Sequence, residues 1–524
     1  MTYPQSYSLP GMLRAAAAAH GARLCVVTPT RRVSFQTFQR EARALARTLT
    51  AAGVRRSDRV AILDVNSIAF LETLCALSMI GAAAVPLNYR QTPAEHRFQI
   101  RDSGARLLLA AERYLEAAEE LRDDLPLGLR SLDAAARKAE EAAAAHAETA
   151  AEDDDPIDPS TPLAICYTSG TTGRPKGAVI DQFTATTRAL RIMYELRLGP
   201  DDVMHMTTPM FHISCLILSL AGLQRGAAQL ILPQFEYEQT IPALREYGVT
   251  FINTVPTILS MALARPDFTP DAFAGLRLIM YTAAPMSLPL LQRWTAVYKG
   301  DLIQFLGQTE DLPQTVLTPE DHRAALAEGD EERLSSVGRA CAGVELKICA
   351  DDGRDAPDGE IGEIATRSGM AMSAYWNLPE ETASTLRDGW VFSGDLGRRD
   401  SQGYVYLAGR KKQMIIRGGE NVYPAEVEPV VLAADGVRDA VVLGLPDPTW
   451  GEIVAAAVVP EGEGEGEGEG DALDADRIIR HCRAHLAGFR CPERIYFFDA
   501  LPLNAAGKVD RQEILGQIEA RDAG

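Results

Sequence analysis

A loop of glycines, hydroxyl side chains and one lysine is the part of this chain best suited to chemistry. It reads Tyr167-Thr-Ser-Gly-Thr-Thr-Gly-Arg-Pro-Lys176-Gly177 and follows the apolar run Leu163–Cys166. Glycine lets a backbone bend with its N–H groups facing outward, and those groups and the hydroxyls suit phosphate oxygens. A P-loop would have glycine before the lysine and Ser or Thr after it. Here Pro175 precedes Lys176, so the spacing predicts a nucleotide-phosphate loop of another kind.

Two carboxylates further along the chain suit a nucleotide and its metal ion. Glu310 ends the segment Gly307-Gln-Thr-Glu310, and Mg²⁺ prefers carboxylate and phosphate oxygens. Asp395 ends Ser393-Gly-Asp395, where a carboxylate can accept hydrogen bonds from both ribose hydroxyls. The remaining segments of interest are Gly81-Ala-Ala-Ala-Val-Pro-Leu-Asn-Tyr89, Pro209-Met-Phe-His212, Gly409-Arg410 and Gly507-Lys508.

In this order, the segments resemble the adenylate-forming superfamily, which holds acyl-CoA synthetases, firefly luciferase and the adenylation domains of peptide synthetases. The resemblance covers essentially the whole chain except the acidic linker before Pro156 and the repeat Glu461–Gly470. It implies an acyl-CoA synthetase: a carboxylic acid attacks the α-phosphorus of ATP and expels pyrophosphate, and the thiol of CoA then takes the acyl group. The alternatives are an adenylate former that loads a carrier protein and a non-catalytic nucleotide-binding homologue.

The first reaction implies a set of residues around ATP. Glu310 would bind Mg²⁺ together with Thr171, Thr309 would face the α-phosphate, and Asp395 and Arg410 would lie at the ribose. Lys508 resembles the family's adenylation lysine, which bridges the incoming carboxylate and the α-phosphate. The other nucleotide contacts that the resemblance implies are Thr168, Ser169, Gly170, Thr172, Gly173, Lys176, Thr282, Ala283, Ala284, Leu306, Gly307 and Gln308.

The second reaction implies a small C-terminal domain that changes orientation about a hinge at residues 410–412, with Lys412 at its centre. After the movement, Gly418, Gly419 and Glu420 would line a tunnel for the pantetheine arm, because glycine leaves room beside the backbone. Phe489 and Arg490 would contact the nucleotide of CoA.

The acyl pocket that the resemblance implies is mostly apolar. His212 would be an aromatic gate, and the pocket would be drawn from Phe211, His212, Ile213, Asn253, Thr254, Tyr281, Ala283 and Gln304. The set has a few polar groups and no basic residue, which favours an aromatic acid or a short- to medium-chain fatty acid over a dicarboxylic acid. Amino-acid-activating relatives place an aspartate in the segment that here reads Phe211-His212-Ile213, and this chain has none there.

The chain departs from the family's pattern at two places. Leu306 stands where an aromatic residue usually stacks on the adenine, and such stacking is worth roughly 1 kcal/mol. We therefore expect Leu306→Tyr to tighten ATP binding. Lys412 stands at the hinge position and Gln413 where an aspartate is frequent.

Composition limits the classes of protein that remain. The 524 residues are too many for one core, and 46% of them are hydrophobic, which is typical of globular chains. A net charge of -20 argues against nucleic-acid binding as a main role. We expect no integral membrane association and no secretory leader, and the eight cysteines without Cys-x-x-Cys spacing predict a reducing cytoplasm. Nothing in the sequence sets the oligomeric state, and a homodimer stays open.

The pattern of apolar residues predicts an α/β fold. Helical spacing over Phe35–Ala52 and Ile68–Ile80 alternates with short apolar strands at Arg59–Asp64 and Ala82–Leu87, an order that favours parallel sheets. A surface helix is expected over Ala135–Glu152. Further strands are expected at Gln229–Leu232, Thr250–Asn253 and Arg277–Tyr281, and a β meander or barrel over Val344–Thr366.

The predicted organisation is a large N-terminal region of two α/β layers and the meander (residues 1–409) and a small mobile α+β C-terminal domain (residues 410–524). The C-terminal strands are expected at Ala440–Leu443, Val454–Val459 and Arg494–Phe498, with a helix over Ala475–Leu486. The repeat Glu461–Gly470 cannot bury apolar surface and should be a disordered loop. His481 and His485 have helical spacing, but no further ligand is placed beside them, so we interpret them as a helix face and not a zinc site.

Overall fold

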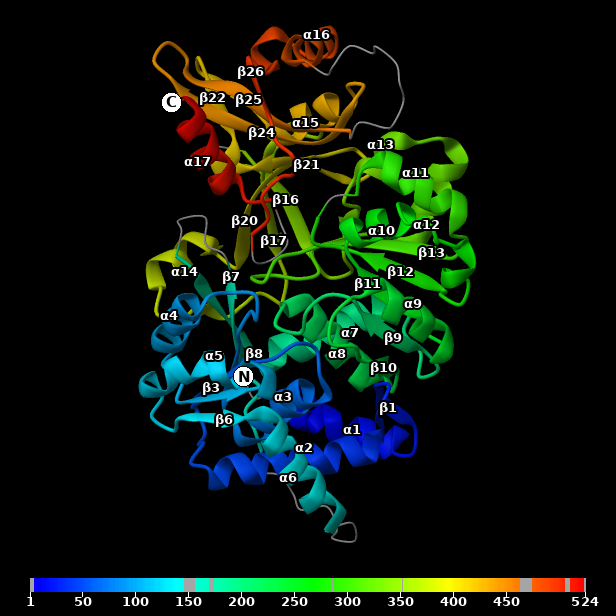
Figure 1. Cartoon of the computed structure of the whole chain (residues 1–524), viewed down its shortest axis with the longest axis vertical. Helices are drawn as coiled ribbons and strands as arrows, with labels where there is room; N and C mark the ends of the chain where they lie inside the picture. Colours follow the sequence, from blue (N-terminus) through cyan, green and yellow to red (C-terminus); the bar gives the residue numbers. More distant parts are fainter. Residues whose placement is uncertain are drawn as a thin grey trace. The chain divides into compact units, whose positions relative to one another are not determined.

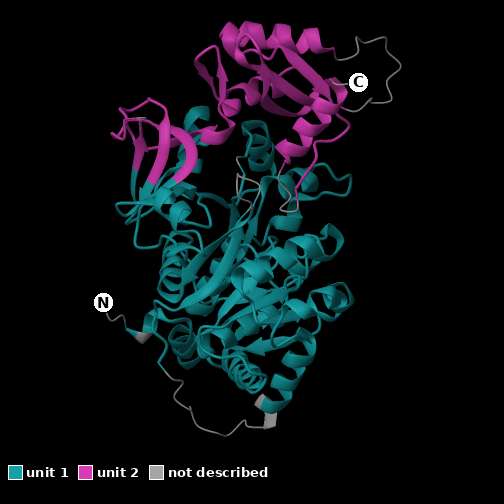
Figure 2. Cartoon of the chain, turned by 90° about the vertical axis from the view of Figure 1, so that its left-hand side faces the viewer, with its two compact units in different colours: residues 1–346, 366–392 teal, residues 347–365, 393–524 magenta. Residues whose placement is uncertain are grey.

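The structure is a computed structural model that describes residues 4–145, 156–168, 174–284, 286–350, 352–461, 474–504 and 509–522. The chain forms two compact units (Figure 2). Unit 1 holds Met1–Leu346 and Thr366–Phe392, and unit 2 holds Lys347–Ala365 and Ser393–Gly524. The hinge that we expect at residues 410–412, with its boundary between residues 409 and 410, concerns a movement and stays a prediction.

The first sheet of unit 1 carries the predicted phosphate loop. Its strand order is β18 (Ala374–Tyr375), β8 (Lys176–Asp181), β7 (Pro162–Thr168), β4 (Ala83–Pro86), β3 (Arg59–Leu63), β5 (Leu107–Ala110) and β6 (Leu129–Ser131). The strands from β7 to β6 are parallel, whereas β8 is antiparallel to both of its neighbours. Apolar residues fill β3, β4 and β5 because helices cover buried parallel strands.

The second sheet of unit 1 has nine strands. Their order is β15 (Arg339–Ala340), β14 (Thr315–Leu317), β13 (Asp301–Leu306), β12 (Leu278–Tyr281), β11 (Phe251–Thr254), β9 (Val203–Met206), β10 (Ala228–Leu230), β1 (Leu24–Val27) and β2 (Arg32–Ser34). The strands from β13 to β1 are parallel, so their carboxyl ends meet along one edge of the sheet. Binding sites in open parallel sheets lie at this edge.

Helices cover both sheets of unit 1 (Figure 1). They are α1 (Leu9–His20), α2 (Phe35–Ala51), α3 (Ile68–Ile80), α4 (Pro93–Ser103), α5 (Leu115–Ala118), α6 (Leu132–Ala145), α7 (Gln182–Glu195), α8 (Ile213–Arg225), α9 (Tyr237–Glu246), α10 (Pro256–Leu263), α11 (Leu288–Val297), α12 (Pro319–Glu328), α13 (Glu331–Ser335) and α14 (Pro379–Thr385). Helices α2 and α3 pack on each other, as do α7 and α8. The Ser67 hydroxyl caps α3 by accepting from the N–H of Phe70 at 2.9 Å, and Gly81 ends that helix with φ of 77°.

Unit 2 is built around a hairpin of two long strands, β24 (Val437–Asp447) and β25 (Gly451–Pro460). Strands β22 (Ile415–Arg417), β23 (Glu420–Val422) and β26 (Arg494–Phe497) extend this sheet, and helices α15 (Pro424–Leu432), α16 (Ala475–His485) and α17 (Arg511–Asp522) accompany it. A further sheet has the order β16 (Glu345–Cys349), β17 (Gly362–Arg367), β20 (Trp390–Arg399) and β19 (Leu386–Arg387), with β21 (Val405–Arg410) paired to β20. The division between the units falls inside β16, β17 and β20.

The expected α/β class, with two α/β layers, a β meander and a smaller α+β part, is confirmed. Helix α3 has the expected bounds, and α2 ends one residue earlier than expected. Of the expected helix Ala135–Glu152, residues 146–152 lie outside the described part, and so do residues 462–470 of the Glu-Gly repeat. All eight cysteines are buried and free. Within the described residues, no helix has both the length and the apolarity needed to cross a membrane.

Candidate active site

Lys176 lies at the start of β8, where the predicted phosphate loop ends. Strands β7 and β8 pair with Thr168 opposite Lys176, and the Thr168 hydroxyl donates to the Lys176 carbonyl at 3.4 Å. The Lys176 ammonium forms an ion pair with Glu381 of α14 and lies 5.2 Å from the centre of the Tyr375 ring. Residues 169–173, which hold the predicted contacts Ser169, Gly170, Thr171, Thr172 and Gly173, lie outside the described residues.

Glu310 is connected to Lys176 through Tyr375. The Glu310 side chain is almost fully buried, and its Oε1 accepts a hydrogen bond from the Tyr375 hydroxyl at 2.5 Å. Burial and the neighbouring Glu310 carboxylate both raise the pKa of the Tyr375 hydroxyl, so it remains a donor. The predicted phosphate lysine lies over the Tyr375 ring, and the predicted metal carboxylate accepts from its hydroxyl, so both groups meet at one tyrosine.

Tyr375 was not among the site residues predicted from the sequence. It belongs to β18, and the antiparallel pairing of β18 with β8 places it opposite Ala178, two residues after Lys176. Two residues along a strand share one face of the sheet. The sequence signal was an aromatic pair, Tyr375-Trp376, but its position beside Lys176 depends on a pairing between segments about 200 residues apart.

The loop before Glu310 is a tight turn at the end of β13. The N–H of Gln308 donates to the Asp311 carbonyl at 2.8 Å, and the N–H of Asp311 donates back to the Gln308 carbonyl at 3.1 Å. Leu306 and Thr309 are half-buried, and Gly307 is exposed. A side chain at Gly307 would meet Leu312 at 2.8 Å, so the turn needs glycine there.

Ala283 is a strained residue among the predicted nucleotide contacts. Its φ is 71°, a left-handed conformation that residues with a Cβ rarely adopt. Ala284 is exposed next to it, while the Thr282 hydroxyl donates to the Phe305 carbonyl at 3.0 Å. Strained backbone gathers at binding and catalytic sites, which agrees with the position of Ala283 at the carboxyl end of β12.

His212 and Phe211 lie at the start of α8. His212 is the residue before the first helical residue, Ile213, and its ring lies 5.2 Å from that of Phe211. Phe211 in turn meets Tyr89 edge to face at 5.5 Å. Tyr89 ends the N-terminal segment of the sequence analysis, so the structure brings together two of its motifs as an aromatic cluster of Tyr89, Phe211 and His212.

The other predicted acyl-pocket residues lie on neighbouring parallel strands. Thr254, Tyr281 and Gln304 occupy the same register on β11, β12 and β13, and all three are buried. The Tyr281 hydroxyl is hydrogen-bonded to His322 of α12 at 2.8 Å, and the ring packs in an apolar cluster with Trp294. Asn253, one residue earlier, accepts from the Thr208 hydroxyl at 2.7 Å and has a buried amide nitrogen without a hydrogen-bond partner.

A cavity of about 210 Å³ opens beside the aromatic cluster. Its lining residues come from separate loops and from α10, and they are Asn66, Tyr89, Arg90, Thr207, Pro209, Pro233, Gln234, Phe235, Ile258 and Met261. The sequence analysis missed this cavity because no single motif carries it. Arg90 gives it one cation, which the predicted acyl set lacked.

In unit 2, Asp395 and Arg410 are paired with each other. They face one another in the ladder between β20 and β21, and Arg410 Nε lies 2.8 Å from the Asp395 carboxylate. Gly394 has φ of 71° and donates its N–H to Glu363 at 3.1 Å. The turn at Gly394 thus precedes a carboxylate that is paired with Arg410, the other residue predicted to lie at the ribose.

The predicted CoA residues of unit 2 form a hairpin turn and a nearby pair. Gly418 and Gly419 are the two residues between β22 and β23, both with positive φ, which this tight turn requires. Glu420 and Lys412 are exposed. Arg490 lies 5.3 Å from the Phe489 ring and forms an ion pair with Glu426 at 3.0 Å. Lys508, the predicted adenylation lysine, lies outside the described residues.

Comparison with known proteins identifies the family. The family model of the AMP-binding enzymes matches residues 13–376, and the model of the AMP-binding enzyme C-terminal domain matches residues 426–508. The chain belongs to the AMP-binding enzyme family. This confirms the resemblance on which the sequence analysis relied.

Relatives of this AMP-binding enzyme cover nearly its whole length. It is 35% identical to indoleacetate–CoA ligase of Aromatoleum aromaticum over 94% of each chain, and 34% identical to feruloyl-CoA synthase of an Amycolatopsis species over 92% of this chain and 93% of that one. Among solved structures it resembles o-succinylbenzoate CoA synthetase of Bacillus subtilis with a TM-score of 0.82 and 27% identity, over 96% of this chain and 98% of that one. That protein has been solved with its acyl-adenylate intermediate and with ATP and magnesium.

The residues present fit a magnesium ion at Glu310. A carboxylate is the hard oxygen ligand that Mg²⁺ prefers, and the hydrogen bond from Tyr375 engages one oxygen of Glu310 in a fixed orientation. When bound, the ion would neutralise charge on the phosphates of ATP. Lys176 supplies a second positive charge beside the same tyrosine ring.

Proposed function

We propose that this AMP-binding enzyme is an acyl-CoA synthetase that joins an aromatic acid to CoA through an acyl adenylate. The observation that carries the proposal is that Lys176 and Glu310 both contact Tyr375. A lysine that binds phosphate and a carboxylate that binds a metal ion, held close together, suit nucleotidyl transfer. The family and the relatives are acid–thiol ligases that form AMP, and the chain retains the motifs of both half-reactions.

In the first half-reaction, a carboxylate oxygen of the acid bonds to the α-phosphorus of ATP while the bond to the β-phosphate bridging oxygen breaks. Pyrophosphate leaves with the electron pair, and no proton is transferred because the acid is ionised at neutral pH. Lys176 binds phosphate charge as a point cation, and Asp395 holds the ribose hydroxyls. Lys508 would bridge the two reacting groups.

In the second half-reaction, the CoA sulfur bonds to the acyl carbon and AMP leaves as the anion. The thiol loses its proton to solvent, since a thiol with a pKa near 8.5 is partly ionised without a dedicated base. Gly418, Gly419 and Glu420 would line the path of the pantetheine arm after a movement about Lys412. The turn geometry of the two glycines is compatible with this role, because neither carries a side chain.

An aromatic acid fits the candidate acyl pocket better than a saturated chain. The rings of Tyr89, Phe211 and His212 contact one another edge to face or tilted, and a further flat ring can pack against such a cluster. Two of the relatives, at 35% and 34% identity, act on indoleacetate and ferulate, according to their names. A short- to medium-chain fatty acid is the second candidate substrate.

The test is a mass-spectrometric screen of the purified protein with Mg·ATP, CoA and pooled aryl, fatty and amino acids. We expect an aryl-CoA together with an equal amount of AMP. Acyl adenylate without thioester would indicate another acceptor, such as a carrier protein. Absence of both products for every acid would overturn the proposal in favour of a non-catalytic nucleotide-binding protein.

We further propose that the enzyme works in the cytoplasm, which its eight free cysteines support. A homodimer stays a prediction that light scattering of the purified protein would test.

A further inference from the structure

Arg188 is a fully buried arginine whose guanidinium binds three main-chain carbonyls. It lies in the middle of α7 and has no exposed surface. Its Nε donates to the Met370 carbonyl at 2.8 Å, Nη1 donates to the Thr309 carbonyl at 3.0 Å, and Nη2 donates to the Glu310 carbonyl at 3.0 Å. Two of the three acceptors are the residues predicted to face the α-phosphate and the metal ion.

The Glu310 residue is therefore held from both of its ends. Its carbonyl oxygen accepts from Arg188 and also from the N–H of Met372 at 2.7 Å, which uses both of its lone pairs. Its carboxylate accepts from the Tyr375 hydroxyl at 2.5 Å. With both ends fixed, the carboxylate has little freedom to turn away from its present direction.

Within the described residues, the Arg188 guanidinium is hydrogen-bonded to carbonyl oxygens and to no carboxylate. Burial lowers the pKa of the Arg188 guanidinium, and the negative charges of Asp311 and Glu310 act against this shift. The Asp311 carboxylate instead accepts from the hydroxyls of Thr366 at 2.7 Å and Ser368 at 3.0 Å. A buried cation that donates to main-chain oxygens of two segments, Thr309–Glu310 and Met370, is suited to fixing the main chain of both.

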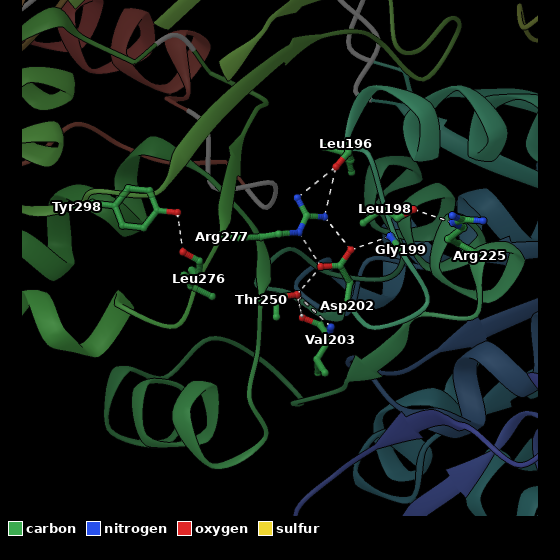
Figure 3. Close-up of polar contacts among 10 residues, drawn as sticks. All are labelled: Leu196, Leu198, Gly199, Asp202, Val203, Arg225, Thr250, Leu276, Arg277 and Tyr298. Atoms are coloured by element: carbon green, nitrogen blue, oxygen red, sulfur yellow. Dashed lines mark hydrogen bonds and ion pairs between the residues drawn. The ribbon is translucent and has the colours of Figure 1, made fainter. Parts of the chain in front are cut away.

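An arginine with a structural ion pair shows the contrast (Figure 3). Arg277 donates to both oxygens of Asp202 at 2.7 Å, and Thr250 donates to the same carboxylate at 2.6 Å. Arg277 also donates to the Leu196 carbonyl at 3.3 Å. This cluster connects strands and a loop of unit 1 and includes none of the predicted site residues.

We propose that Arg188 is a positioning residue that sets the main chain of Thr309 and Glu310, and through it the direction of the carboxylate that binds Mg²⁺ with ATP. The proposal rests on the proposed function of Glu310. The planar fork is essential to it, because the guanidinium donates from three separate nitrogens held in one plane, whereas an ammonium donates from a single nitrogen.

The experiment compares Arg188→Lys with Arg277→Lys, since each keeps the charge and loses the fork. Binding of Mn²⁺ with a non-hydrolysable ATP analogue is measured by electron paramagnetic resonance, well below the melting temperature of each variant. We expect Arg188→Lys to raise the Kd of Mn²⁺ at least tenfold while the KM of the acid stays within twofold. Arg277→Lys should lower the melting temperature and leave the Kd of Mn²⁺ within twofold.

Mn²⁺ binding by Arg188→Lys equal to that of the wild type would overturn the proposal and leave Arg188 a stabilising residue only. If Arg188→Lys does not yield folded protein, Arg188→Gln takes its place in the same measurements, because its amide nitrogen still donates hydrogen bonds. Failure of the proposed function would give a different result from failure of this inference. In that case the wild type makes no acyl adenylate, while the Mn²⁺ comparison still reports whether Arg188 sets the Glu310 carboxylate.

Discussion

Two arginines of unit 1 are held in opposite ways. Arg277 forms a fork-to-fork ion pair with Asp202, and its side chain is 39% exposed. Arg188 has no exposed surface and donates only to carbonyl oxygens. The first arrangement pairs a buried carboxylate with an arginine of the protein. In the second, Arg188 binds the carbonyl of Glu310 and not its carboxylate, which leaves the carboxylate for a metal ion.

The two regions differ in what their hydrogen bonds hold: a structural ion pair in one, and the main chain of the candidate active site in the other. In the Asp202 cluster both carboxylate oxygens accept from Arg277, and Thr250 and Gly199 donate to them as well, so the carboxylate charge is paired in the folded state. Around Glu310 the donors hold the main chain and one carboxylate oxygen. Substitutions in the two regions should therefore move different observables.

The largest effect is expected at the catalytic region. Glu310→Gln removes the carboxylate charge but keeps an oxygen that accepts from Tyr375, so the fold should survive. We expect the acid-dependent exchange of pyrophosphate into ATP to fall on the order of 10²–10³-fold, the usual cost of one electrostatic group in an active site. A melting temperature within a few degrees of the wild type is the control. Wild-type exchange by this variant would remove Glu310 from the chemistry.

The second effect is expected at the structural region. Arg277→Met leaves Asp202 without its main donor and should lower the free energy of unfolding by about 2 kcal/mol, less than a fully buried pair because Arg277 is partly exposed. Urea denaturation measures the change. The KM values of ATP and acid should not move, and a change in either would mean that the two regions are coupled.

A smaller effect is expected at the connection between Lys176 and Glu310. Tyr375→Phe removes only the hydroxyl, so the ring stays beside Lys176 while Glu310 loses one hydrogen bond. That bond is worth about 1.5 kcal/mol, so we expect kcat to fall roughly tenfold. The matched control is Tyr298→Phe, which removes a buried hydroxyl that donates to the Leu276 carbonyl (Figure 3). Equal losses of activity in both variants would contradict a role for the Tyr375 hydroxyl.

The smallest effect is expected from pH. Burial acts to raise the pKa of Asp202, but hydrogen bonds from Arg277, Thr250 and Gly199 outweigh it and hold the pKa below its usual range. A carboxyl with a lowered folded pKa stabilises the protein above its unfolded pKa, which is about 3.9. The difference in unfolding free energy between wild type and Asp202→Asn should be constant from pH 5 to 8 and shrink as the pH falls below about 4. A difference that grows in acid would contradict the ion-pair account.

Much of the fold could be predicted because local patterns and tertiary structure agree. Helix α3 begins at Ile68 and ends at Ile80 as predicted, since Ser67 caps one end and Gly81 the other. The β24–β25 hairpin is longer than the strands expected at Ala440–Leu443 and Val454–Val459. The additional residues mix buried apolar positions such as Leu445 and Ile453 with charged, glycine and proline positions, and this mixture interrupts the continuous apolar run that marked the strands.

The candidate site was predictable where a motif carries it and not where packing does. Lys176, Glu310 and Asp395 were named from short segments. Arg188 was missed, because an arginine in mid-helix usually marks a solvent-facing position, and only the tertiary structure brings Thr309 and Met370 to it. Tyr281 was assigned to the acyl pocket from its place on a strand end, and its hydroxyl is hydrogen-bonded to His322 instead. Its role stays a prediction.

The burial of every cysteine has a consequence for an enzyme that handles an activated acyl group. Cys166 lies two residues before Thr168, and Cys215 lies three residues after His212, yet burial raises the pKa of each thiol to about 12. A neutral, enclosed thiol is a poor nucleophile. The enzyme thus brings a reactive mixed anhydride and an external thiol together with no exposed cysteine thiol of its own competing for the acyl group, and alkylating reagents should leave the folded protein active.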